Sequence, residues 1–131
     1  MNRVGILASV LVGVFLAALV MSAAQEQEYP YDAYRAEKNL EIGLYYLKKS
    51  NYDAAIERFR ESIRFKPNYA RPHRLIAEAY EKKGDRVEAI KYYERYLEIL
   101  PSADDAEKVR KRIQKLAQAL EREARRKRRS D

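Results

Sequence analysis

The residues that most often carry chemistry are scarce in this chain, which has one histidine, His73, and no cysteine. Without cysteine there is no disulfide, no thiol nucleophile and no thiolate metal ligand. A single histidine with no cysteine or second histidine to accompany it does not make a metal site, so no metal site is predicted. His73 is interpreted as a packing or exposed side chain, and neither a catalytic residue nor a cofactor is predicted.

Carboxylates are common, but they alternate with lysine and arginine at helical spacing. Pairs such as Glu57–Glu61 and Glu78–Lys82 lie one helical turn apart and are typical of solvated helix faces. The chain contains no serine–histidine–acid set, no phosphate-binding glycine loop and no divalent-metal loop. We therefore expect that the protein is not an enzyme.

Basic residues outnumber acidic ones, 27 against 20, which gives a formal net charge of +7. They crowd the C-terminal end, in a basic tail that contains Arg122, Arg125, Arg126, Lys127, Arg128 and Arg129. One interpretation is a solvated helix end, where cations interact favourably with the helix dipole. The other is attraction to an anionic surface, such as phospholipid headgroups, a wall polymer or an acidic partner.

The first 24 residues differ from the rest of the chain. Arg3 precedes an apolar run from Val4 to Val20, and small residues up to Ala24 precede the polar Gln25. This order is typical of a secretory signal peptide that is cleaved near Ala24. The apolar run also suits an uncleaved single-pass anchor, because a spanning helix needs roughly 20 residues. Both alternatives place the rest of the chain on the exported side, since the positive charge precedes the apolar run.

An internal repeat organises the middle of the chain. Positions 34 residues apart carry the same or a similar residue: Ile42 and Ile76, Gly43 and Ala77, Tyr46 and Tyr80, Lys48 and Lys82, Ala55 and Ala89, Phe59 and Tyr93, Pro67 and Pro101. A fixed period of this length, with helical spacing inside each copy, is typical of a helix–turn–helix repeat array. At these residues the chain resembles the tetratricopeptide repeat (TPR) family, and the resemblance covers residues 36–103.

The resemblance implies an all-α fold, a short right-handed α-solenoid of antiparallel helix pairs, to which the sequence adds an N-terminal apolar helix. The predicted organisation is a signal peptide or anchor over residues 1–24, a linker and helix start over 25–35, repeats over 36–69 and 70–103, and a capping helix with the basic tail over 104–131. Small residues at Gly43 and Ala77 are expected where the second helix of each pair crosses the first.

Capping and turn residues set the expected helix boundaries. Helices are predicted over residues 33–49, 52–66, 69–83, 86–100 and 103–129. The expected signals are side-chain caps at helix starts, a glycine turn and a capping box. They are the N-caps Asp32, Asn51 and Asn68, the turn Gly84–Asp85, and the pair Ser102 and Asp105.

In the TPR family, the first helix of each repeat lines a groove that holds an extended peptide or a partner helix. The matching residues here are Glu37, Leu40, Leu44, Leu47 and Lys48 in the first repeat, and Arg71, Arg74, Glu78, Glu81 and Lys82 in the second. The clamp that some members use for a C-terminal carboxylate is not reproduced, so chaperone tails are not expected as ligands. The alternative is that the three leucines are covered by the chain's own segment around Tyr29–Tyr34, since a short array must cover its ends.

These features predict a non-catalytic protein–protein interaction module, a scaffold, adaptor or assembly factor, that binds a protein or peptide ligand on the exported side of a membrane, in the periplasm or outside the cell. The alternative is a membrane-tethered protein whose basic tail binds an anionic membrane or wall polymer. Nucleic acid is not expected as a partner, because the chain carries an export signal and its basic cluster lacks interleaved aromatic residues for base stacking.

Overall fold

The computed structural model describes residues 30–130, which form five helices and no strand. The helices are α2 (Ala33–Lys48), α3 (Tyr52–Phe65), α4 (Ala70–Lys83), α5 (Arg86–Ile99) and α6 (Ala106–Ser130). The all-helical fold predicted from the sequence is confirmed, and the helix ends agree with the predicted ones within a few residues. The predicted signal peptide or anchor and its apolar helix lie outside the described residues.

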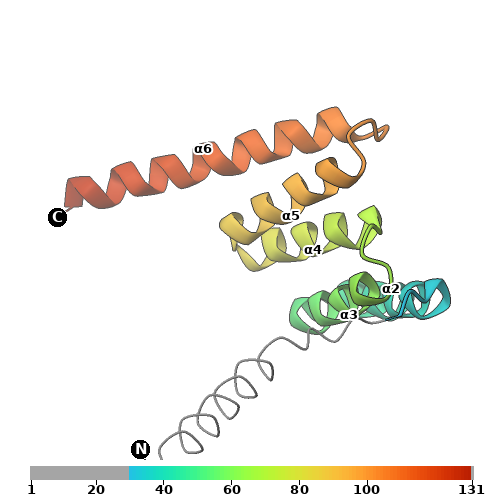
Figure 1. Cartoon of the computed structure of the whole chain (residues 1–131). Coiled ribbons are helices and arrows are strands. Elements are labelled where there is room, and N and C mark those ends of the chain that lie inside the picture. The colour runs from blue at the N-terminus through green and yellow to red at the C-terminus, as the bar shows by residue number, and fades with distance from the viewer. Residues whose placement is uncertain (1–29, 131) are drawn as a thin grey trace, which may run out of the picture.

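The helices form a TPR-like stack of antiparallel pairs, one layer after another (Figure 1). Helix α2 packs against α3, and α4 packs against α5. The contact between α3 and α4 joins the two pairs, and α6 packs on α5. Because α6 is the longest of the described helices, its C-terminal turns extend past the beginning of α5 (Figure 1).

Two of the expected helix caps are present. The Asp32 side chain accepts a 2.9 Å hydrogen bond from the main-chain N–H of Arg35, at the start of α2. The Asn51 side chain accepts one of 3.3 Å from the N–H of Ala54, at the start of α3. Such caps satisfy N–H groups that have no partner within the helix. Gly84 takes a φ of 84°, the left-handed conformation that glycine adopts most easily, so α4 ends there as predicted.

Two predicted caps are wrong. Helix α4 begins after Tyr69, which makes no side-chain cap bond, so Asn68 is one residue too early to serve as the cap. Helix α6 begins at Ala106, four residues after Ser102. Consecutive main-chain turns, in which the N–H of Ala103 bonds to Leu100 and that of Ala106 to Ala103, delay its start. The predicted capping box of Ser102 and Asp105 therefore does not form at the helix start.

Small residues let the paired helices approach closely. Gly43 of α2 is buried, and a Cβ atom there would lie 2.6 Å from Cδ1 of the Phe59 ring in α3. Ala77 of α4 is also buried and belongs to the same core cluster as Ala89 and Tyr93 of α5. The expectation that these two positions are small because a second helix packs there is confirmed.

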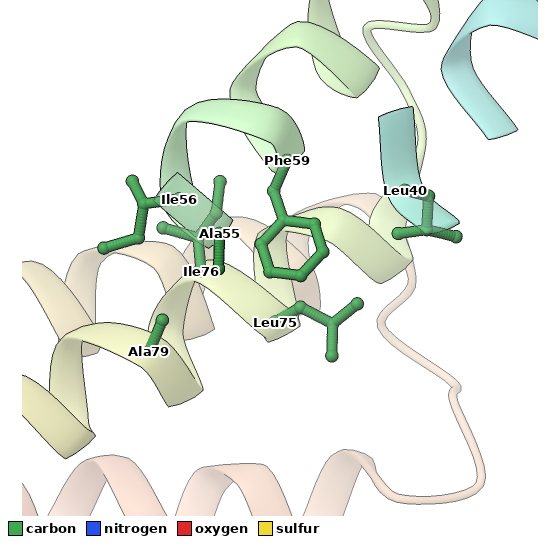
Figure 2. Packing of buried hydrophobic residues seen from close by; sticks show 7 residues of the cluster. All are labelled: Leu40, Ala55, Ile56, Phe59, Leu75, Ile76 and Ala79. Carbon is green, nitrogen blue, oxygen red and sulfur yellow. The ribbon is translucent and has the colours of Figure 1, made fainter. Parts of the chain in front are cut away.

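The core consists of two clusters that follow the order of the pairs. The second cluster contains Ala77, Ala89, Tyr93, Tyr96, Val109 and Leu116, so it joins α4 and α5 to the capping helix α6. The first cluster joins α2, α3 and α4, and its side chains gather between these helices in Figure 2: Leu40, Ala55, Ile56, Phe59, Leu75, Ile76 and Ala79. The stack is therefore continuous from α2 to α6.

Candidate partner-binding site

The apolar half of the predicted groove belongs to the core. Leu40 has no exposed surface and lies in one cluster with Phe59 of α3 and Leu75 of α4 (Figure 2). Leu44 and Leu47 are half-buried and pack against the same cluster. The prediction that Leu40 lines an accessible groove is wrong, because α3 and α4 cover this side chain.

The alternative cover for these leucines is also wrong for the part of the segment that the structure describes. Tyr31 is 68% exposed and Tyr34 is 78% exposed, so neither ring shields Leu40. Tyr29 lies outside the described residues. The burial of Leu40 thus comes from α3 and α4, and not from the segment that precedes α2.

Several charged residues of the predicted groove bind neighbouring parts of the fold. A carboxylate oxygen of Glu37 in α2 accepts a 2.5 Å hydrogen bond from the hydroxyl of Tyr69, just before α4. Arg74 of α4 pairs with Glu78 at 3.1 Å and with Asp105, just before α6, at 3.5 Å. These bonds place the first helix of each pair beside the first helix of the next.

Glu81 is the most heavily bonded of the predicted groove residues. Its carboxylate pairs with Arg112 of α6, at 2.6 Å, and accepts a 3.1 Å hydrogen bond from the hydroxyl of Tyr93 in α5. The charge of Glu81 is therefore balanced within the fold. Together with Arg74, it fixes α4 against the capping helix. We define the α2–α4–α6 face by the charged residues of the predicted groove together with the charged partners of Arg74 and Glu81; it consists of Glu37, Lys48, Arg71, Arg74, Glu78, Glu81, Lys82, Asp105 and Arg112.

Two tyrosines beside this face donate hydrogen bonds to its carboxylates. Burial raises the pKa of Tyr93 well above its ordinary value, and the negative charge of Glu81 raises it further. Burial also raises the pKa of Tyr96 to about 12, with a contribution from its 2.6 Å hydrogen bond to Asp105. Both phenols therefore keep their protons at neutral pH and hold the two carboxylates in place.

Two lysines on this face are left without such bonds. Lys48 ends α2 and Lys82 lies in the last turn of α4, at corresponding positions of the repeat. Both are exposed, and neither forms an ion pair with any residue in the described range. Arg71 is exposed on the same helix as Lys82. The acidic groups of the face are satisfied internally, so its available charges are positive.

The basic tail is part of α6 and does not form one patch. At 3.6 residues per turn, Arg122, Arg126 and Arg129 fall on one side of the helix. Arg125 lies about 40° from Arg129 around the helix, but its charge is balanced by an ion pair with Glu121 at 2.6 Å. Lys127 and Arg128 fall on two further sides of the same helix.

Sequence reasoning missed the groups that connect the helices. Tyr69, Tyr93, Asp105 and Arg112 are the partners of the predicted groove residues, yet none was singled out as such. Each bond joins two different segments of the fold, so helical periodicity within one segment carries no sign of it. The pairing of Arg112 with Glu81, for example, spans 31 positions of the chain.

His73 is buried, at 6% exposure, and neither ring nitrogen has a hydrogen-bond partner among the described residues. Its ring lies 6.1 Å from that of Tyr92, centroid to centroid. Burial lowers the pKa of His73, and the nearby charge of Arg95 lowers it further. Residues 30–130 contain no group of three or more histidine, cysteine, aspartate or glutamate side chains that could hold a metal ion. No helix in that range is long and apolar enough to span a bilayer.

Comparison with known protein families gives one match over most of the described helices. The model of the family described as Regulator of microtubule dynamics protein 1-3 (RMD1-3) matches residues 37–121. The chain belongs to this family. The match begins within α2 and ends within α6, so it includes most of α2, all of α3, α4 and α5, and most of the capping helix.

Two curated proteins of Arabidopsis thaliana resemble this RMD1-3 family member over part of its length. A probable UDP-N-acetylglucosamine–peptide N-acetylglucosaminyltransferase, SEC, is 35% identical over 65 residues, which are 50% of this chain and 7% of that protein. Hsp70-Hsp90 organizing protein 3 is 33% identical over 86 residues, which are 66% of this chain and 15% of that protein. The chain thus spans only a small part of either relative.

Two crystal structures of MamA are similar to this chain. One has a TM-score of 0.53 and 20% sequence identity, and the match covers 72% of this chain and 63% of MamA. The other has a TM-score of 0.48 and 39% identity, and covers 49% of this chain and 35% of MamA. The first likeness supports the fold: the helix pairs are stacked as in a TPR-like solenoid.

Proposed function

We propose that this chain is a non-catalytic module that binds an acidic segment of a protein partner on the α2–α4–α6 face, as a scaffold, adaptor or assembly factor. The observation that carries the proposal is the position of Lys48 and Lys82. They occupy the same place in successive first helices, are exposed and lack internal ion pairs, while the carboxylates of the same face are bonded within the fold.

The similar proteins support a binding role without identifying the partner. Their names refer to microtubule dynamics, to organizing Hsp70 and Hsp90, and to a peptide glycosyltransferase. These names differ in activity and in partner, whereas the helical repeat is what the matched segments have in common. The simplest role that all of them can share is that the helical repeat presents a binding surface to other proteins.

A site-specific photo-crosslinker tests the proposed face. We would place it at position 71, which is exposed on this face, with position 58 of α3 as the control, because Arg58 is also exposed and makes no ion pair within residues 30–130. An adduct with the partner should form from position 71 but not from position 58. The variant K48E/K82E should lose it, and the variant R58E/K127E, which reverses two charges elsewhere, should keep it. Adducts that survive K48E/K82E would place the binding surface elsewhere.

The exported location is part of this proposal and depends on the sequence before residue 25, where Arg3 precedes the apolar run. Cleavage near Ala24 would give a periplasmic or secreted protein, and retention would give a single-pass anchor. The intact mass of the protein made in its host distinguishes the two, since cleavage removes 24 residues. Full-length protein in the soluble cytosolic fraction would contradict both.

A further inference from the structure

One side of α6 carries a row of basic residues that is longer than the tail. At 100° per residue, six of them fall within an arc of roughly 60°, and the row extends over about 31 Å at 1.5 Å per residue. We call it the α6 basic row; it consists of Lys108, Lys111, Lys115, Arg122, Arg126 and Arg129. All six side chains are exposed.

No side chain of the α6 basic row makes an ion pair or hydrogen bond with a described residue, whereas three other cations of the same helix do. Arg110 pairs with Glu107, Arg112 with Glu81, and Arg125 with Glu121. A solvated helix normally intersperses both signs of charge, and this helix does so on its other sides. The row is thus a line of positive charge that the fold does not balance.

The row is held rigidly over much of its length. Val109 and Leu116 of α6 are buried in the second core cluster, which fixes the N-terminal half of the helix on the repeats. Farther along, Glu123 pairs with Arg86 of α5 at 2.6 Å. A preformed row lowers the entropy that must be lost when a partner binds, because the helix that carries its side chains is already ordered.

The chemistry of the row favours an acidic protein segment over other anionic partners. The apolar side of α6 faces α5, so it is not available for insertion into a bilayer. The row contains no aromatic side chain on which a base could stack. A row along one side of a single helix suits one extended or helical chain with carboxylates along one of its sides.

We propose that the α6 basic row binds an acidic segment of the protein partner, in addition to the contacts at Lys48 and Lys82. This inference rests on the proposed function, that the chain binds proteins, but uses a separate surface. Lys108 lies three residues beyond Asp105, which pairs with Arg74, so the row begins next to the α2–α4–α6 face. One acidic segment can thus continue from that face along α6.

The test measures binding of a fluorescein-labelled peptide of sixteen glutamates to the full chain by fluorescence anisotropy. The variant K108Q/K111Q/K115Q should bind it about tenfold more weakly, since each exposed charge pair contributes a fraction of a kcal/mol. The control R58Q/K127Q/R128Q removes three exposed charges outside the row and should change the affinity about twofold or less. Equal losses in the two variants would overturn the proposal. Circular dichroism confirms that each variant is folded.

The C-terminal half of the row has a control in the same turns of α6. The variant R126Q/R129Q should weaken binding of the glutamate peptide more than K127Q/R128Q, which removes two charges from other sides of the helix. Binding to vesicles containing phosphatidylserine and to a 20-base-pair DNA is measured at the same ionic strength. If the chain binds either of them more tightly than the peptide, the row is assigned to a lipid or a nucleic acid, and the proposal is overturned.

The crosslinking experiment separates this inference from the proposed function. If K48E/K82E loses the partner adduct and K108Q/K111Q/K115Q retains it at the same yield, the α2–α4–α6 face binds the partner and the α6 basic row does not. If both variants retain the adduct, both proposals are wrong. The expected result is a loss in K48E/K82E and a reduced yield in K108Q/K111Q/K115Q.

Discussion

The Phe59 ring of α3 occupies the space where the α2 residue Gly43 has no side chain. A Cβ atom at Gly43 would lie 2.6 Å from Cδ1 and 3.1 Å from Cζ of this ring. Phe59 has no exposed surface and forms part of the first core cluster with Leu40 and Leu75. The contact between these two residues therefore sets how closely the first helix pair can pack, and with it the position of α2 on the stack.

Gly43→Ala should lower the free energy of unfolding by about 1–3 kcal/mol, because the added methyl group overpacks the contact with Phe59. The higher helix propensity of alanine, about 1 kcal/mol, offsets part of the loss. Urea denaturation measures the effect. In the background of Phe59→Leu, the same substitution should cost less, since the smaller side chain leaves room for a methyl group. Equal costs in both backgrounds would show that the ring is not what excludes the side chain.

Ser62→Ala should destabilise the protein by about 1 kcal/mol. The Ser62 hydroxyl is fully buried in α3 and donates a 2.6 Å hydrogen bond to the main-chain carbonyl oxygen of Ala36 in α2. Ser102→Ala is the matched control, because Ser102 is exposed in the turn before α6 and does not cap this helix. Denaturation midpoints should shift for the first variant only. A comparable loss of stability for Ser102→Ala would mean that Ser102 caps α6, as predicted from the sequence.

The sequence predicted those features whose causes lie within one repeat. Asp32 and Asn51 could be recognised as caps because each accepts from an N–H only three residues away. Gly43 could be recognised because its counterpart one repeat later, Ala77, is also small. Such local signals, together with the apolar periodicity, were enough for an all-helical stack of pairs.

The groove could be predicted only in part, because the surroundings of its residues come from other helices. Leu40 follows the spacing of a groove residue, but Leu75 and Phe59 bury it. Glu81 is a typical surface residue by sequence, yet it bonds to Arg112 and to the buried Tyr93. Which positions of a solenoid remain accessible depends on how successive layers stack, and one segment's periodicity does not contain that information.

Arg112→Ala should loosen the capping helix without unfolding the stack. Its guanidinium pairs with Glu81 of α4, so its loss removes a bond between α6 and the repeats. Hydrogen exchange of α6 amides should become faster, while global stability falls by about 1 kcal/mol or less, as expected for a partly exposed pair.

The control for this variant is Arg110→Ala. Arg110 pairs with Glu107 within α6 and donates to the carbonyl oxygen of Pro101, so it makes no bond to the earlier helices. Exchange in the middle of α6 should therefore remain close to that of the unmodified protein. If both substitutions speed exchange there equally, the bond to Glu81 does not secure the helix.

Protonation of His73 should destabilise the fold. Its pKa is lowered from 6.5, first by burial and then by Arg95, while Glu98 and the main chain at Pro67 oppose the shift. The unfolded chain therefore takes up the proton at a higher pH than the folded one. The stability associated with His73 is complete above about pH 6.5 and is lost as the pH falls below it, by at most about 1.4 kcal/mol per pH unit.

The matched variant is His73→Phe, which keeps an aromatic ring beside Tyr92 but cannot take up a proton. Between pH 7.5 and 5.5 its free energy of unfolding should change less than that of the unmodified protein. Since His73 is the single histidine of the chain, its ring resonances in an NMR titration can be assigned without ambiguity, and their midpoint should lie below 6.5. A midpoint at or above 6.5, or equal pH dependence in the two proteins, would mean that the buried ring is charged without cost in the folded state.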